Sequence, residues 1–213
     1  MGAHAQYKDL QEGTNADYIP APAAVPSEFF SISLCTVDDK VYDVGDANYP
    51  FSIQSMSKVF TLAIAIQKLG SQAIVDSIGV NATGHAFNSV VAIEDIHDRP
   101  SNSCVNAGVI ATTILLPGTS YDEKWNQIIN SFSQFAARPL SITTEVYESE
   151  AASNQHNQAI SLLLASYGRI YNDPMETVDL YTKQCSINVN SHDLAIMSGT
   201  LANGGINPSP KKN

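Results

Sequence analysis

The chain has 213 residues, of which 44% are hydrophobic, so it is long enough to bury a substantial core as one large domain or two small ones. It carries 11 basic and 21 acidic side chains, which give a formal net charge of -10. The basic residues are scattered apart from Lys211 and Lys212. Without a basic stripe the sequence does not fit a nucleic-acid-binding protein, and its composition fits neither a disordered nor a fibrous chain.

Features that would indicate a membrane, secreted or metal-binding protein are missing from the sequence. The longest apolar run, from Val59 to Ile66, is interrupted by Thr61 and is far shorter than the roughly 18 to 20 residues that cross a bilayer. The N-terminus is polar and lacks the plan of a signal peptide. The three cysteines include no C-x-x-C pair, and the five histidines form no pair at ligand spacing. We expect a cytoplasmic protein with no membrane partner, no metal and no cofactor.

Strand signals lie near the start of the chain. Residues 30–37 alternate, with Phe30, Ile32 and Leu34 on one face and small or polar side chains on the other. This period of two predicts a half-buried strand. Residues 38–40 have turn composition and Val41 to Val44 returns, so the two runs predict an antiparallel hairpin.

The rest of the sequence is mainly helical. Helices are predicted from Ser55 to Leu69, after the capping box Ser120-x-x-Glu123, from Asn154 to Tyr167, from Asp173-Pro174 onward, and from Ser191 to Asn203. The helix that begins at Asp173-Pro174 places Val178, Tyr181 and Cys185 on one face. Helices outnumber strands, and the strands gather at one end of the chain. The sequence therefore predicts an α+β fold, with a helical cluster against a small antiparallel sheet.

The spacing Ser55-x-x-Lys58 carries the clearest chemical signal. Residues at i and i+3 of a helix are neighbours, so the Lys58 amine can reach the Ser55 hydroxyl. A serine becomes a useful nucleophile when a base takes its proton, and a lysine can be that base when apolar surroundings lower its pKa. Ser55 would also lie at a helix N-terminus, where free N–H groups can bind an oxyanion.

The same spacing has a simpler interpretation, in which Ser55 caps the helix and Lys58 lies in solvent. Two further hydroxyls compete with Ser55 for the role of nucleophile. Ser57 is adjacent to Lys58 but points to a different helical face, and Ser52 lies in the preceding extended segment.

A series of short motifs in a fixed order resembles the glutaminase family. They are Asp17-Tyr18-Ile19-Pro20, Cys35-Thr36-Val37-Asp38, Gly45-Asp46, Phe51-Ser52-Ile53-Gln54-Ser55-x-Ser57-Lys58, Phe87-Asn88-Ser89, Val105-Asn106-Ala107-Gly108, Cys185-Ser186-Ile187 and Leu201-Ala202-Asn203-Gly204-Gly205. Several of these motifs are weak alone, but the ordered set is specific. It extends over residues 15–207 and identifies residues 1–213 as a single glutaminase-type catalytic domain.

The resemblance implies a fold like that of serine β-lactamases and penicillin-binding proteins. It further implies hydrolysis of L-glutamine to L-glutamate and ammonia, with Ser55 as the nucleophile and Lys58 as the general base. The substrate-binding residues that it implies are Ser55, Tyr18, Asn106, Glu150, Asn157 and Tyr181. Glu150 would hold the α-ammonium group of the substrate by a charge-assisted hydrogen bond. The family also suggests a homo-oligomer, a dimer or a tetramer.

Without the resemblance these residues have ordinary interpretations. Glu150 would be a solvated acid at a helix start, Asn157 a surface amide and Tyr181 a core aromatic residue.

The sequence departs from the family at its C-terminal end. Family members continue past Leu201-Ala202-Asn203-Gly204-Gly205 into a Gly-Met-Tyr segment and a Lys-Ser-Gly strand, which this chain lacks. We therefore expect a truncated domain with an incomplete sheet. Two alternatives to glutamine turnover stay open: an inactive fragment that binds glutamine or forms oligomers, and another serine amide hydrolase of the same fold, acting on a β-lactam or a peptide.

Overall fold

The chain folds into two compact units. The computed structural model describes residues 2–15, 23, 25–95 and 99–209. Unit 1 consists of Met1–Ile53, Ile129–Ser149 and Ile187–Asn213. Unit 2 consists of Gln54–Ile128 and Glu150–Ser186.

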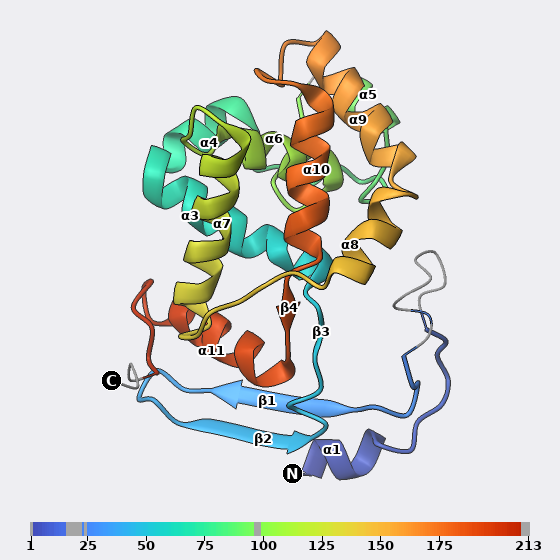
Figure 1. The fold of residues 1–213 in the computed structure, drawn as a ribbon, viewed down its shortest axis with the longest axis vertical. Coiled ribbons are helices and arrows are strands. Elements are labelled where there is room, and N and C mark those ends of the chain that lie inside the picture. Colours follow the sequence, from blue (N-terminus) through green and yellow to red (C-terminus); the bar gives the residue numbers. More distant parts are fainter. Residues whose placement is uncertain (1, 16–22, 24, 96–98, 210–213) are drawn as a thin grey trace. The chain divides into compact units, whose positions relative to one another are not determined.

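Unit 1 contains the strands β1 (Ser31–Cys35), β2 (Val41–Gly45), β3 (Phe51–Ser52) and β4 (Asn188–Val189), with the helices α1 (Gly2–Tyr7) and α11 (Ser191–Ala202). Strands β1 and β2 form the predicted antiparallel hairpin, in which Ile32 lies opposite Val44 and Leu34 opposite Tyr42. Strands β3 and β4 form a second, very short antiparallel pair. Helix α11 packs against β1 (Figure 1).

The alternation in β1 is present, but its small and polar face is the one that meets α11. The Ser191 hydroxyl donates a hydrogen bond to Ser33 Oγ at 2.9 Å, and a β-carbon added at Gly199 would lie only 2.9 Å from Cys35 Sγ. The apolar face is left open, since Leu34 is 54% exposed and Tyr42 57% exposed. Small side chains let the helix approach the strand closely, and this overrides the preference for burying the larger ones.

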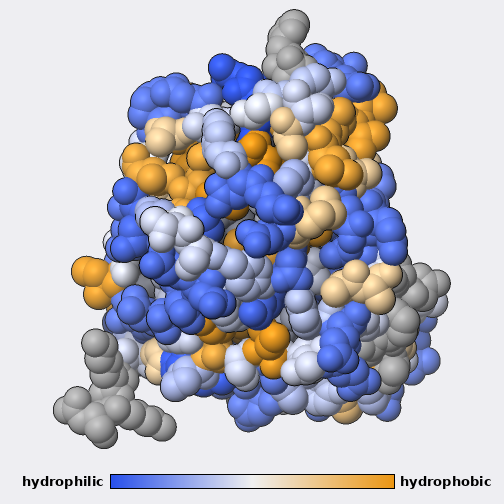
Figure 2. Space-filling view, turned by 45° about the horizontal axis from the view of Figure 1, so that its top comes forward, coloured by the Kyte–Doolittle hydropathy of each residue, from blue (hydrophilic) through white to orange (hydrophobic). Residues whose placement is uncertain are grey.

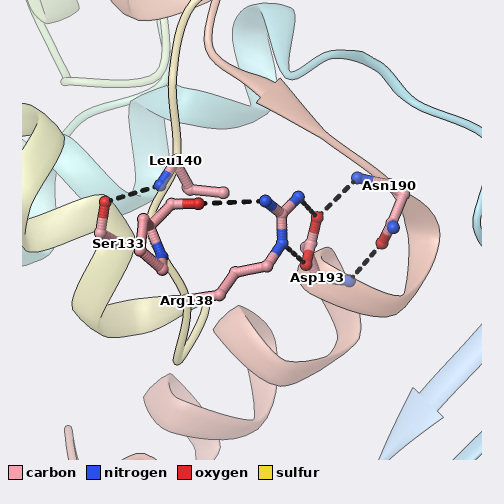
Figure 3. Close-up of polar contacts among 6 residues, drawn as sticks. Ser133, Arg138, Leu140, Asn190 and Asp193 are labelled. Atoms are coloured by element: carbon pink, nitrogen blue, oxygen red, sulfur yellow. Dashed lines mark hydrogen bonds and ion pairs between the residues drawn. The ribbon is translucent and has the colours of Figure 1, made fainter.

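A network of polar contacts fixes the start of α11 within unit 1 (Figure 3). Asn190 and Asp193 form a capping box: Asn190 Oδ1 accepts from the Asp193 N–H at 2.8 Å and Asp193 Oδ2 accepts from the Asn190 N–H at 2.9 Å. Arg138 donates from Nε to Asp193 Oδ1 at 2.6 Å and from a terminal nitrogen to Oδ2. Asp193 is 2% exposed. Two nitrogen atoms of the Arg138 guanidinium balance the charge of this buried carboxylate.

Unit 2 is a cluster of helices arranged around a fully buried one. Helix α6 (Asn106–Leu115) is buried from Asn106 to Ile114. It contacts α3 (Ser57–Leu69), α9 (Gln155–Ser166) and α10 (Pro174–Cys185). The shorter helices α4 (Ser71–Ser77) and α5 (Val91–Asp95) belong to the same unit. A helix that is apolar on all sides needs neighbours all round, and these three helices supply them.

The helices predicted from capping and periodicity are present. Helix α7 (Tyr121–Phe135), which begins in unit 2 and ends in unit 1, follows Ser120, whose hydroxyl accepts from the Glu123 N–H at 3.2 Å. Helix α10 is capped by Asp173, which accepts from the N–H groups of Met175 and Glu176, and its residues Tyr181 and Cys185 are buried as expected. The predicted helix from Ser55 to Leu69 is divided into a 3₁₀ turn, η1 (Gln54–Met56), and α3.

Hydrophobic side chains on the surface form separate patches among hydrophilic ones in the view of Figure 2. The exposed large apolar residues come from many elements and include Leu34, Tyr42, Val80, Phe87, Leu162 and Tyr171. In the described ranges, no helix combines the length and hydropathy that a transmembrane segment requires.

Candidate active site

Ser55 lies in η1, two residues before α3 begins at Ser57. The residue before it, Gln54, has a φ of 52°, in the left-handed region that side chains other than glycine rarely adopt. This turn presents Ser55 at the surface, where the residue is exposed. A nucleophile must meet its substrate, and an exposed serine just before α3 satisfies that requirement.

Lys58 is buried in unit 2, although it is a residue type that is usually solvated. It is 5% exposed, and its Nζ donates to Asn106 Oδ1 at 2.7 Å and to the Cys104 carbonyl at 3.2 Å. The Phe87 ring lies over the amine, with 5.5 Å between Nζ and the ring centroid. Burial lowers the pKa of Lys58 below its ordinary value, against a smaller opposing effect of Cys185 and Cys104.

Asn106 connects this lysine to a second amide. It is the first residue of α6, and its backbone N–H donates to the Phe87 carbonyl at 2.8 Å. Its Nδ2 donates to Asn157 Oδ1 on α9 at 2.9 Å, while its Oδ1 faces Lys58. The two bonds use opposite ends of the Asn106 amide, so the amide can satisfy both only in this orientation.

Glu150 is the one acid in the candidate site and lies near the end of α8 (Thr144–Ala151). Burial raises its pKa to about 7, and a hydrogen bond from Gln54 Nε2 to Glu150 Oε2, at 3.4 Å, lowers it. A carboxyl group with that pKa is partly protonated at neutral pH. A cationic ligand would favour its ionised form.

Tyr181 places a phenol beside Ser55, the candidate nucleophile. It is 2% exposed on α10. Burial raises the pKa of Tyr181 well above its ordinary value, a negative charge on Cys185 would raise it further, and a hydrogen bond with Ser55 lowers it. Burial also raises the pKa of Cys185 to about 12, which keeps that thiol protonated and unreactive.

Six of the seven residues predicted for the site belong to unit 2: Ser55, Lys58, Asn106, Glu150, Asn157 and Tyr181. They are connected as a Lys58–Asn106–Asn157 chain, a Ser55–Tyr181 contact and a Glu150 carboxyl held by Gln54. Within the described contacts, the Lys58 amine is bonded to Asn106 and Cys104 rather than to Ser55. Tyr18 lies outside the described residues.

Sequence reasoning gave no role to three further groups near these residues. Gln54 and Phe87 belong to recognised motifs, but nothing in the sequence indicates that one side chain reaches Glu150 and the other covers Lys58. The Cys104 carbonyl is a backbone group, which no residue pattern could identify. In the part of the chain that the structure describes, no group of three or more His, Cys, Asp or Glu side chains is placed to hold a metal.

Similarity to known proteins extends over nearly the whole chain. The sequence profile of the glutaminase family matches residues 13–213. A glutaminase from Mycobacterium ulcerans (strain Agy99) is 48% identical over 208 residues, which are 98% of this chain and 65% of the relative. The chain therefore spans about two thirds of the length of this curated relative.

Solved structures also resemble this chain. A probable glutaminase, ybaS, superposes with a TM-score of 0.95 at 43% identity, over 97% of this chain and 67% of that one. The structure of Mglu in its glutamate form superposes with a TM-score of 0.92 at 35% identity, over 99% of this chain and 49% of that one. The fold is the glutaminase fold, mainly helical with small antiparallel sheets. By its sequence and by its fold, the chain belongs to the glutaminase family.

Proposed function

We propose that the chain hydrolyses the side-chain amide of L-glutamine to L-glutamate and ammonia, through an acyl-enzyme on Ser55. The observation that carries this proposal is the environment of Lys58. A neutral amine has two N–H bonds and one lone pair. The two hydrogen bonds of Nζ, to Asn106 Oδ1 and to the Cys104 carbonyl, use both N–H groups and leave the lone pair to accept a proton.

The reaction then has two balanced halves. The Lys58 amine takes the proton of Ser55 Oγ as this oxygen attacks the carboxamide carbon, and the ammonium so formed returns the proton to the departing nitrogen. Ammonia leaves and the glutamyl ester remains on Ser55. A water molecule attacks that ester, Ser55 recovers its proton through the same amine, and glutamate is released.

The remaining site residues fit an amino-acid substrate better than a β-lactam or a peptide. An ionised Glu150 would pair with the α-ammonium group, which peptides and β-lactams do not offer at that position. Asn157 accepts from Asn106 through Oδ1, so its own amide N–H groups are directed elsewhere and suit a carboxylate. Mglu, which has been solved in a glutamate form, is a precedent in a structural relative.

Ammonia release in the presence of L-glutamine tests this function. We expect Ser55→Ala to reduce the rate by about a thousandfold or more, because no other hydroxyl takes its place. Ser166→Ala, an exposed serine at the end of α9, is the matched control and should retain the full rate. A Ser55→Ala variant with unchanged turnover would refute the role of Ser55.

Two other outcomes would favour the alternatives. Cleavage of the β-lactam nitrocefin without glutamine turnover would indicate another acyl hydrolase of the same fold. A non-catalytic protein that binds glutamine is the second candidate. In that case calorimetry would detect glutamine binding that Ser55→Ala leaves intact, with no ammonia release in either protein.

A further inference from the structure

Gln54 combines an unusual backbone with an unusual side-chain partner. Its φ of 52° is in the left-handed region, although it is not a glycine. Such a conformation is strained and persists where the surroundings enforce it. The residue that bears this strain is the one directly before the candidate nucleophile Ser55.

The Gln54 side chain reaches a residue 96 positions away in the sequence. Its Nε2 donates to Glu150 Oε2 at 3.4 Å, a long hydrogen bond that strengthens when the carboxyl group is ionised. Among the described residues, Tyr181 and Cys185 of α10 are the other titratable groups that interact with Glu150, and its negative charge disfavours the ionisation of both. Gln54 donates a hydrogen bond to the Glu150 carboxyl, and this favours the ionised carboxylate.

We propose that Gln54 is a positioning residue, which holds the Glu150 carboxylate ready for the substrate ammonium while its own backbone sets the turn that presents Ser55. This inference rests on the proposed function, because it takes Ser55 as the nucleophile and Glu150 as the group that binds the ammonium. The backbone of Gln54 precedes Ser55, and its side chain binds Glu150. Gln54 itself transfers no proton in this arrangement.

The hydrogen bond from Gln54 orients the Glu150 carboxylate. A carboxylate has two oxygens and can turn about its terminal bond. With Oε2 held by the Gln54 amide, Oε1 keeps a fixed direction and can accept from a substrate ammonium. Gln54 also directly precedes Ser55. The distance between the Glu150 carboxylate and the Ser55 hydroxyl therefore depends on one side-chain contact, the hydrogen bond from Gln54 to Glu150. That spacing would select amino acids by side-chain length.

The test replaces Gln54 with methionine, which preserves its length and removes its donor. In ¹³C-labelled protein the Glu150 carboxyl is titrated by NMR, and L-glutamine affinity is measured by calorimetry across pH. We expect Gln54→Met to raise the Glu150 titration midpoint above about 7 and to weaken glutamine binding at neutral pH by about tenfold. Gln158→Met, on α9, is the matched control and should change neither quantity.

A second variant protects the test against misfolding. Gln54→Gly also lacks the donor but adopts the left-handed backbone without strain, so it should fold at least as well as the wild type and raise the same midpoint. An unchanged Glu150 midpoint in both variants would overturn the inference. If the midpoint rises while the wild-type chain binds no glutamine, the coupling of Gln54 to Glu150 stands and the proposed substrate is wrong.

Discussion

Burial shifts the pKa of Lys58 and that of Glu150 in opposite directions, and the proposed reaction uses both shifts. Burial disfavours the charged form of each, so the pKa of the amine falls and the pKa of the carboxyl rises to about 7. The lowered pKa increases the neutral fraction of Lys58, which a general base requires. The raised pKa makes the charge of Glu150 depend on its partners, which suits a group that binds a cation.

The pKa of Glu150 predicts a pH-dependent cost to stability. Below about pH 4.5 the carboxyl is protonated in the folded and unfolded states. As pH rises from 4.5 to about 7 the unfolded chain loses the proton first, so the free energy of unfolding falls, and above 7 it stays at the lower level. We expect Glu150→Gln to remove this fall and to gain about 1–3 kcal/mol relative to the wild type between pH 5 and pH 8.

Urea denaturation of both proteins at the two pH values measures that difference, with the exposed Glu148→Gln as the matched control. The same Glu150→Gln variant should lose glutamine binding. Equal pH dependence of stability in wild type and Glu150→Gln would show that the carboxyl titrates normally in the folded protein.

Sequence reasoning named candidate site residues but not the bonds between them. Ser55 and Lys58 were predicted from a spacing of three, and the other positions came from family motifs. We predicted that Ser55 and Lys58 lie on one continuous helix. The structure instead places Ser55 in a 3₁₀ turn that begins at Gln54, whose backbone is left-handed, and it places Lys58 in α3. Nothing in the identity of a glutamine indicates that it will bear such a strain.

At the scale of elements, α6 organises the site. It places Asn106 at its first position, where Lys58 and Asn157 can both reach the side-chain amide. Its third residue is Gly108, where an added β-carbon would lie 1.7 Å from the Asn102 carbonyl oxygen. The helix can therefore approach the preceding loop only because this position lacks a side chain.

Gly108→Ala should push α6 away from the loop at Asn102. We expect it to lower the free energy of unfolding by about 1–3 kcal/mol, which is the usual cost of overpacking a core. It should also weaken glutamine binding, since Asn106 moves with the helix. Urea denaturation and calorimetry measure the two effects.

Gly13→Ala is the control, because a β-carbon there meets nothing within 4 Å. If Gly108→Ala were as stable as the wild type, the close approach of α6 to the loop would not constrain the fold.

Helices with clear end signals were predicted, and helices without them were not. The capping signals Asp173-Pro174 and Ser120-x-x-Glu123 correctly predicted the starts of α10 and α7. Helix α6 was missed because it is buried on all sides and has no polar stripe to give it a period, and α8 was missed because it is short and largely polar. These two helices carry Asn106 and Glu150, whereas Asn157 and Tyr181 lie on the predicted helices α9 and α10.

At the scale of the whole molecule, the predicted α+β composition is confirmed, and strands are confined to unit 1 of the described chain. The division into two units was not predicted, because each unit is assembled from segments distant in sequence. The six described site residues belong to unit 2 alone, which is built from residues 54–128 and 150–186.

The most direct test is to look for the covalent intermediate. The chain is mixed with L-glutamine, quenched in acid within milliseconds to seconds, digested and analysed by mass spectrometry. We predict a glutamyl group on the peptide that contains Ser55 in the wild type, and its absence in Lys58→Met, which keeps the length of the side chain but has no amine. Ammonia release without a glutamyl ester on Ser55, or an ester that forms equally well in Lys58→Met, would contradict the account.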